Sequence, residues 1–176
     1  RVRRVKRLAF VLFLTGCGSS ELDTGLDAEL VLSSATEEQR ATFCEGTTSW
    51  AVSYDKRNQT GICRFNGYDA ARMSMDAARC EEVTKTCRDT KIDESQYGCF
   101  FPLNCEVTVA EYESCFDAFA EREAVVFEEI AARSCEELVT ETGRFSFLPE
   151  LALPSACAGI DERCPGANLD SLFFAE

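Results

Sequence analysis

The chain has 176 residues, with 31 acidic and 18 basic side chains, no histidine and a net charge of −13 at neutral pH. Such an acidic composition argues against nucleic acid and anionic lipid headgroups as partners, because proteins bind both through basic patches. The absence of histidine removes the Ser-His and Cys-His nucleophile pairs and the mixed Cys/His zinc sites.

The first sixteen residues have the pattern of a secretory signal peptide. Five basic residues occupy the first seven positions, and an apolar run follows from Leu8 to Leu14. This run is too short to span a bilayer, which requires about 20 apolar residues. We expect residues 1–16 to be removed on export, which would change the net charge from −13 to −18 because five basic and no acidic residues are lost.

The segment Leu14-Thr15-Gly16-Cys17 resembles the lipobox of bacterial lipoproteins. The resemblance implies that the Cys17 thiol receives a diacylglyceryl group, that cleavage occurs before Cys17, and that a fatty acid such as palmitate acylates the new amino terminus. Several acyl chains, at about 0.8 kcal/mol per buried CH₂, would anchor the protein stably in the lipid bilayer. Gly18, at the position of the family's sorting residue, implies the outer membrane of the cell envelope. The alternative is an ordinary signal peptide with a chance cysteine at the cleavage site.

Residues 17–34 are predicted to form a lipidated, flexible tether, because residues 18–34 are polar, acidic and short of core side chains. About 17 flexible residues would reach on the order of 20–25 Å. In the alternative, Leu30-Val31-Leu32 docks as a short strand. Residues 35–176 are predicted to form one cysteine-rich domain.

The first predicted helix spans about residues 35–54 and begins with a capping box of Ser34 and Glu37. Its apolar residues recur at helical spacing. Trp50 and Tyr54 belong to this stripe and are expected to pack in the core. The alternative is that they form an aromatic binding surface.

Residues 58–68 contain two glycines and two asparagines and are predicted to form a turn. The second predicted helix spans about residues 69–88, with one face formed by Met73, Ala77, Cys80, Thr84 and Cys87. Seven residues separate Cys80 from Cys87, about 10.5 Å along a helix, whereas bridged Cα atoms lie within about 7 Å. Both cysteines are therefore expected to bridge to neighbouring elements.

Residues 89–105 are predicted to form a loop that carries two cysteines and the adjacent aromatic residues Phe100 and Phe101. A loop held by disulfides that displays two aromatic rings is a possible contact surface. In the alternative, both rings fold inward under the loop.

The longest predicted helix spans about residues 109–133 and begins with a capping box of Thr108 and Glu111. Its apolar face consists of Tyr112, Phe116, Phe119, Val126 and Ile130. Glu123 interrupts this stripe. We expect Glu123 to lie at the edge with its carboxylate in water, and the alternative is a buried functional acid.

A third capping box, Ser134 with Glu137, predicts a short helix after the longest one. Residues 142–154 break the helical pattern, and the alternation at Phe145-Ser146-Phe147 is too short to define a sheet. Ser155 is expected to cap a last short helix that ends at Cys164, between two prolines.

Ten cysteines follow Cys17, an even number that fits five disulfides in an exported protein. The sequence does not determine their pairing. Cys-x-x-Cys is absent, so zinc ribbons and thioredoxin-like redox pairs lack their signature, and no metal or other cofactor is expected. The ten are Cys44, Cys63, Cys80, Cys87, Cys99, Cys105, Cys115, Cys135, Cys157 and Cys164.

The cysteine spacing and the phrase Pro154-Ser155-Ala156-Cys157…Cys164-Pro165-Gly166 resemble small cysteine-rich helical lipoproteins of unknown function from myxobacteria. The resemblance covers about residues 41–166. It implies a location and a fold, but no catalytic residues.

The sequence therefore predicts a mainly α protein, a small helical bundle with about five disulfides and irregular loops. The expected function is non-catalytic: a domain anchored in the envelope that binds an envelope or extracellular partner or has a structural role. The alternative is a carboxylate-dependent, glycosidase-like hydrolase, because a pair of acids can catalyse glycoside hydrolysis without histidine.

Overall fold

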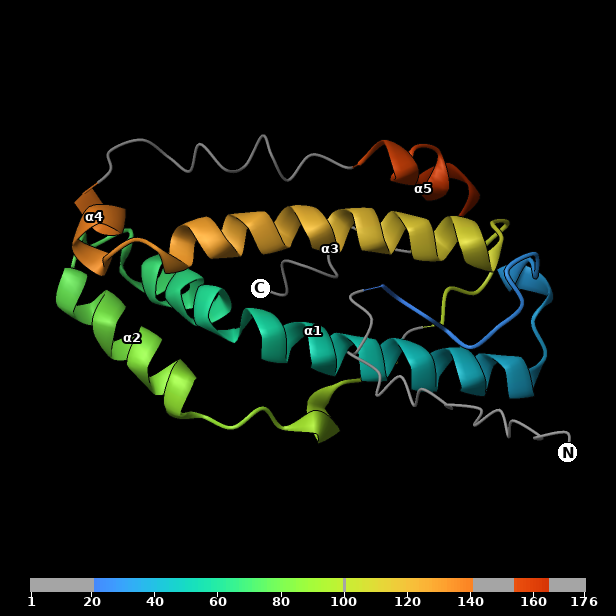
Figure 1. The fold of residues 1–176 in the computed structure, drawn as a ribbon, viewed down its shortest axis with the longest axis horizontal. Helices are drawn as coiled ribbons and strands as arrows, with labels where there is room; N and C mark the ends of the chain where they lie inside the picture. Colours follow the sequence, from blue (N-terminus) through green and yellow to red (C-terminus); the bar gives the residue numbers. More distant parts are fainter. Residues whose placement is uncertain (1–20, 100, 141–153, 165–176) are drawn as a thin grey trace, which may run out of the picture.

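The computed structural model describes residues 21–99, 101–140 and 154–164, and this part of the chain is mainly helical (Figure 1). The α-helices are α1 (Glu37–Ala71), α2 (Ala77–Asp89), α3 (Val109–Ala131), α4 (Cys135–Thr140) and α5 (Ile160–Arg163). Short 3₁₀ helices are η1 (Leu32–Ser34), η2 (Glu94–Gln96) and η4 (Ser155–Cys157). The predicted fold class, a helical bundle with five disulfides, is confirmed.

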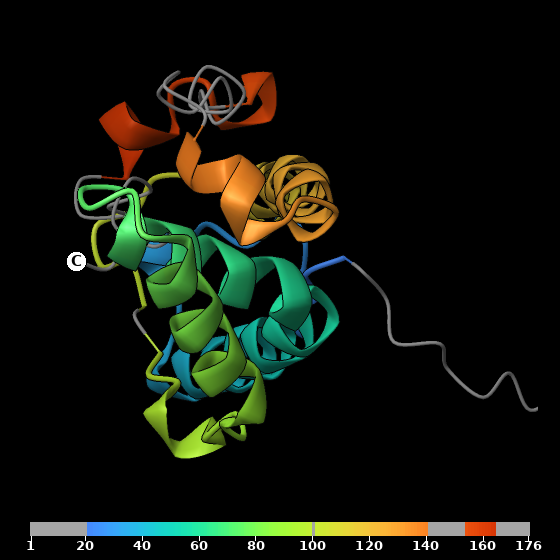
Figure 2. The ribbon, with the colours of Figure 1, turned by 90° about the vertical axis from the view of Figure 1, so that its left-hand side faces the viewer.

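Helix α1 is the central element and contacts both α2 and α3 (Figure 2). In Figure 1, α1 and α3 lie side by side and run in the same direction, whereas α2 runs back along the second half of α1. The loop after α2 returns the chain to the start of α3. The main core cluster lies where the first halves of α1 and α3 meet, around Phe43, Tyr112 and Phe116.

The predicted turn at residues 58–68 is wrong, because α1 continues without a break to Ala71. The two glycines of this segment lie where α1 meets its neighbours. A Cβ atom at Gly61 would overlap with Phe127 of α3, and one at Gly67 would overlap with the Thr84 hydroxyl of α2. These glycines therefore permit close helix packing, although glycine disfavours a helix by about 1 kcal/mol relative to alanine.

The second helix begins later than predicted, at Ala77. The Asp76 carboxylate caps it by accepting hydrogen bonds from the backbone N–H groups of Ala78 and Arg79, at 3.0 and 3.1 Å. Met73 was expected on the inner face but lies before the helix and is 91% exposed. The prediction for Met73 is wrong because the chain must turn between α1 and α2 at this point.

The capping box predicted at Ser34 and Glu37 lies two residues further on, at Thr36 and Gln39. Each of these side chains bonds the other's backbone N–H. The predicted capping boxes Thr108–Glu111 and Ser134–Glu137 are both confirmed.

Near the end of the described chain, the expected single helix from Ser155 is divided into η4 and α5. Gly159 separates them with a backbone φ of +74°, a conformation that favours glycine. Ser155 is the first residue of η4 and Pro154 is its N-cap, so the expected cap at Ser155 is wrong. The predicted break at residues 142–154, including Phe145 and Phe147, lies outside the described residues except for Pro154.

Residues 21–34 pack on the domain, which corrects the prediction of a flexible tether for this part of the chain. Leu22, Thr24 and Leu32 are buried. Val31 and Thr108 form an antiparallel bridge, and the Leu32 N–H donates to the Val107 carbonyl at 3.0 Å. The segment Leu30-Val31-Leu32 therefore docks, as in the alternative, but through a single bridge at Val31 followed by η1 and not as a short strand.

Five disulfides join all ten cysteines after Cys17, as the sequence predicts. They connect α1 with the loop before α3, α1 with α2, α2 with α4, residues just before α3 with the end of α5, and α3 with η4. The expectation that Cys80 and Cys87 bridge to neighbouring elements is confirmed. The pairs are Cys44–Cys99, Cys63–Cys87, Cys80–Cys135, Cys105–Cys164 and Cys115–Cys157.

Across the described residues, no helix combines the length and the apolar character needed to cross a bilayer.

Candidate functional site

Helices α1 and α3 and the loop before α3 surround a pocket of about 360 Å³, here called the aromatic pocket. Trp50 and Tyr54 lie one helical turn apart on α1 and stack with ring centroids 5.3 Å apart. Phe116 of α3 meets Trp50 edge-on at 6.3 Å. The lining residues are Leu22, Thr47, Trp50, Ala51, Tyr54, Asp55, Ile62, Tyr97, Gly98, Cys99, Tyr112, Phe116, Glu123 and Phe127.

Glu123 lines this pocket and is only 5% exposed. The expectation that its carboxylate lies in water is therefore wrong, and the alternative of a buried acid is correct as to burial. Its Oε2 accepts a hydrogen bond from the Tyr54 hydroxyl at 3.1 Å. Helix α3 places the side chain here because Glu123 belongs to the same stripe as Phe116 and Val126.

Burial raises the pKa of Glu123 from the ordinary 4.5 to about 7. The hydrogen bond from Tyr54 opposes this increase in pKa, and the nearby charge of Asp55 adds to it. The carboxyl group of Glu123 therefore changes its charge near neutral pH. A buried acid of this kind in a pocket is a recognised sign of a functional site.

The Tyr54 hydroxyl can serve both charge states of Glu123. It lies 3.1 Å from the Glu123 carboxylate and 3.4 Å from the Ala120 carbonyl. When Glu123 is ionised, Tyr54 donates its proton to the carboxylate. When Glu123 is protonated, its own O–H can donate to Tyr54, which then donates to Ala120. Burial raises the pKa of Tyr54 far above its usual range, so the phenol stays protonated.

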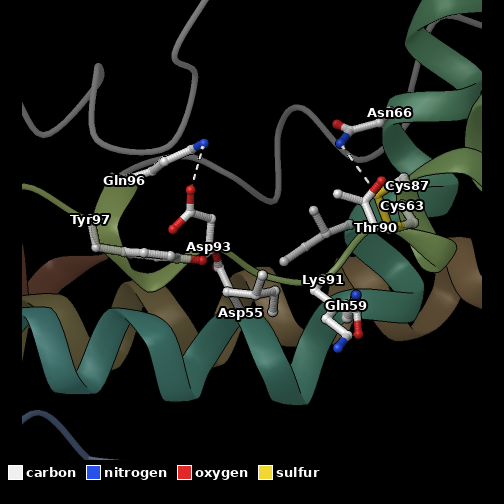
Figure 3. Close-up of a pocket in the computed structure, with 12 residues that line it drawn as sticks. Asp55, Gln59, Cys63, Asn66, Cys87, Thr90, Lys91, Asp93, Gln96 and Tyr97 are labelled. Carbon is white, nitrogen blue, oxygen red and sulfur yellow. Dashed lines mark hydrogen bonds between the residues drawn. A yellow bond between two sulfur atoms is a disulfide. The ribbon is translucent and has the colours of Figure 1, made fainter.

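A second, more polar pocket of about 490 Å³ adjoins the aromatic pocket and shares Asp55, Ile62 and Tyr97 with it (Figure 3). The Tyr97 hydroxyl donates a hydrogen bond to the Asp55 carboxylate. Burial and this bond to Asp55 raise the pKa of Tyr97 above its usual range. Tyr97 thus lies at the boundary between the two pockets.

Two disulfides hold the walls of these pockets. Cys44–Cys99 ties the loop that carries Tyr97 to α1, and Cys63–Cys87 lies at the other end of the polar pocket (Figure 3). The polar pocket is otherwise lined by amide, hydroxyl, charged and aliphatic side chains: Gln59, Asn66, Thr90, Lys91, Ile92, Asp93 and Gln96. Covalent bonds to α1 therefore position the loop between the pockets.

The structure places the residues singled out in the sequence in different environments. Phe101 is half-buried, with its ring edge-on to Phe43 at 5.0 Å and the Arg40 guanidinium 5.4 Å from its centroid. This arrangement fits the alternative in which the ring folds inward. Phe100 and Cys17 lie outside the described residues.

Tyr54 packs in the core as expected, while Trp50 is half-buried at the pocket wall. No local sequence pattern predicts that Asp55, Tyr97 and Glu123 line one pocket, because these residues come from three separate segments. The one signal was the acid that interrupts the apolar stripe of α3. Within the described residues, no three acidic or cysteine side chains form a group suited to a metal ion.

Comparison of this chain with protein-family models, with curated proteins and with solved structures found no match.

Proposed function

We propose that this protein is a non-catalytic binding protein of the bacterial cell envelope, anchored in the outer membrane through lipidated Cys17. The observation that carries the binding role is the aromatic pocket, with six aromatic side chains around one buried acid. Its volume lies within the about 300–1,000 Å³ of small-molecule sites, which are apolar with a few placed polar groups. The resemblance of Leu14-Thr15-Gly16-Cys17 to a lipobox supports the anchor.

Binding of a fluorescent dye, with and without a substitution that fills the pocket, tests this proposal. N-phenyl-1-naphthylamine is a neutral apolar dye that accepts energy from tryptophan, and Trp50 is the single tryptophan of the chain. We expect saturable transfer from Trp50 to the dye in the wild-type protein. Ala51→Phe adds a ring at the pocket wall and should weaken dye binding about tenfold or more.

The matched control is Ala70→Phe, which adds the same ring at an exposed position of α1. It should leave dye binding unchanged. Dye binding that is absent from the wild-type protein, or equally affected by both substitutions, would refute the pocket as the binding site.

A carboxylate-dependent hydrolase is the second candidate, and one observation favours it: Glu123 and Asp55 line the same pocket. In glycoside hydrolases an acid with a raised pKa protonates the leaving group, while a second carboxylate acts as nucleophile or base. A panel of nitrophenyl glycosides tests this candidate. Hydrolysis should exceed the buffer rate, and only Glu123→Gln, not the exposed control Glu128→Gln, should abolish it. A wild-type rate equal to that of buffer eliminates the hydrolase.

A further inference from the structure

The charged side chains that line the aromatic pocket are all acidic. Its described lining residues include the carboxylates of Asp55 and Glu123 but no lysine or arginine. Aromatic rings add to this, because their π faces are negative. Arg57 of α1 acts on Tyr54 through its charge but does not line the pocket, so an anionic ligand would meet acids at the wall and a net charge of −13 around it.

We propose that the aromatic pocket selects a small organic cation with an alkylated ammonium group, held against the aromatic rings with Glu123 as its counter-charge. This inference rests on the binding function proposed above and specifies its ligand class. Cations over aromatic faces gain about 0.5–2 kcal/mol each, most when they are desolvated. Trp50, the strongest such partner, lies at the wall.

The aromatic lining of the pocket favours an alkylated over a primary ammonium, because six aromatic side chains make up much of its wall. A primary ammonium carries three strongly hydrated N–H donors, and leaving them unbonded in an apolar site is unfavourable. Each carboxylate accepts one hydrogen bond, Asp55 from Tyr97 and Glu123 from Tyr54, and keeps further lone pairs. The aromatic rings around them offer no comparable acceptor to a primary ammonium, but their faces attract an alkylated one. A quaternary ammonium has no N–H donor and so needs no hydrogen-bond acceptor. Only its positive charge must be balanced, which the Glu123 carboxylate can do.

The geometry also couples binding to the protonation of Glu123. A cation in the pocket stabilises the carboxylate over the neutral acid, so binding releases the proton that Glu123 holds below its pKa of about 7. The other titratable groups lining the pocket are Asp55 and Tyr54 from α1, Tyr97 from the loop and Tyr112 from α3. Arg57 of α1 acts on Tyr54 from outside the lining and stays charged throughout this pH range. Burial raises the pKa of all three tyrosines, so they remain neutral in this range. Affinity for the cation should therefore fall as the pH decreases below 7.

Choline and its neutral isostere 3,3-dimethyl-1-butanol provide a matched pair of probes, since they differ in one atom and in charge. Binding is measured by calorimetry and by the fluorescence of Trp50 on the full mature protein. At pH 8 we expect choline to bind about tenfold or more tightly than the isostere. The affinity for choline should fall about tenfold between pH 8 and pH 5.5.

Glu123→Gln should remove the pH dependence and reduce the preference for choline to what the rings and Asp55 provide, while binding of the isostere is retained as evidence of an intact pocket. Glu128→Gln, an exposed change on the same helix, should behave as wild type. Equal affinities for choline and the isostere at pH 8, or no binding of choline, would overturn the inference. Dye binding that persists in that case would leave the proposed binding function standing, whereas its loss as well would refute both.

Discussion

Replacing Glu123 with glutamine should make the protein more stable at alkaline pH. The carboxyl group has a pKa of about 7 in the folded protein and 4.5 as its ordinary value. At about 1.4 kcal/mol per pKa unit, ionised Glu123 costs the folded state about 3 kcal/mol. Glutamine has nearly the same shape, can still accept the hydrogen bond from Tyr54, and carries no charge to bury.

The direction in which the stability changes with pH follows from the number of protons that the folded and unfolded states bind. Between pH 4.5 and about 7 the folded state retains a proton on Glu123 that the unfolded chain has released, so stability from this group falls as the pH rises. Below 4.5 both states are protonated and the penalty disappears. Glu123→Gln should therefore match wild type at pH 4 and exceed it by up to about 3 kcal/mol at pH 8.

Denaturant unfolding with intact disulfides, followed by the fluorescence of Trp50, measures these free energies at each pH. The exposed Glu128→Gln on the same helix corrects for loss of a charge from an acidic protein. A Glu123→Gln variant whose stability differs from wild type by the same amount at pH 4 and pH 8 would refute the reasoning. So would a variant that is less stable at pH 8, since the hydrogen bond from Tyr54 would then outweigh burial.

Three further predictions concern packing, the disulfides and the anchor. Gly61→Ala should destabilise the protein by about 1–3 kcal/mol through overpacking against α3, measured by thermal melting, whereas Gly98→Ala, with open space around it, should have little effect; equal melting temperatures for the two variants would contradict the close contact. Replacing both Cys44 and Cys99 with serine should lower stability by about 2–5 kcal/mol and weaken dye binding, because the loop that carries the pocket wall is released; unchanged dye affinity would show that this disulfide does not hold the pocket. Intact mass of membrane-extracted protein should correspond to a chain that begins at lipidated Cys17 and takes up ten alkyl groups only after reduction; free thiols before reduction would disprove the five disulfides, and a lipid-free mass would disprove the anchor.

Local signals predicted the elements whose stability is largely local. Helix α3 agrees with the sequence within two residues at its end because its apolar period and its capping box, Thr108 with Glu111, act over a few residues. The same holds for the capping box at Ser134 and Glu137. The existence of five disulfides was also predicted, from the even number of cysteines after a segment that resembles a signal peptide.

The sequence pattern failed where a distant segment determines what a residue does. Gly61 and Gly67 are turn residues by local preference, but they lie inside α1 because close packing of α3 and α2 against their bare Cα atoms offsets the unfavourable helix propensity of glycine. The pairing of cysteines likewise depends on which elements become neighbours. Residues 21–34 look like a tether because their few apolar side chains are buried by segments distant in the sequence, including α1, α3 and the residues before α3.

The candidate site is also a feature that segments distant in the sequence determine. The sequence by itself determined a helical, disulfide-bonded, acidic domain after a lipobox-like segment, since composition, periodicity and spacing are properties of the chain alone. Only the tertiary structure decided that Glu123 is buried beside Tyr54 and shares a pocket with Asp55 and Trp50. The physical reason is that a pKa and a binding pocket depend on desolvation and on charges from other elements, and these exist only once α1, α3 and the loop between them have packed.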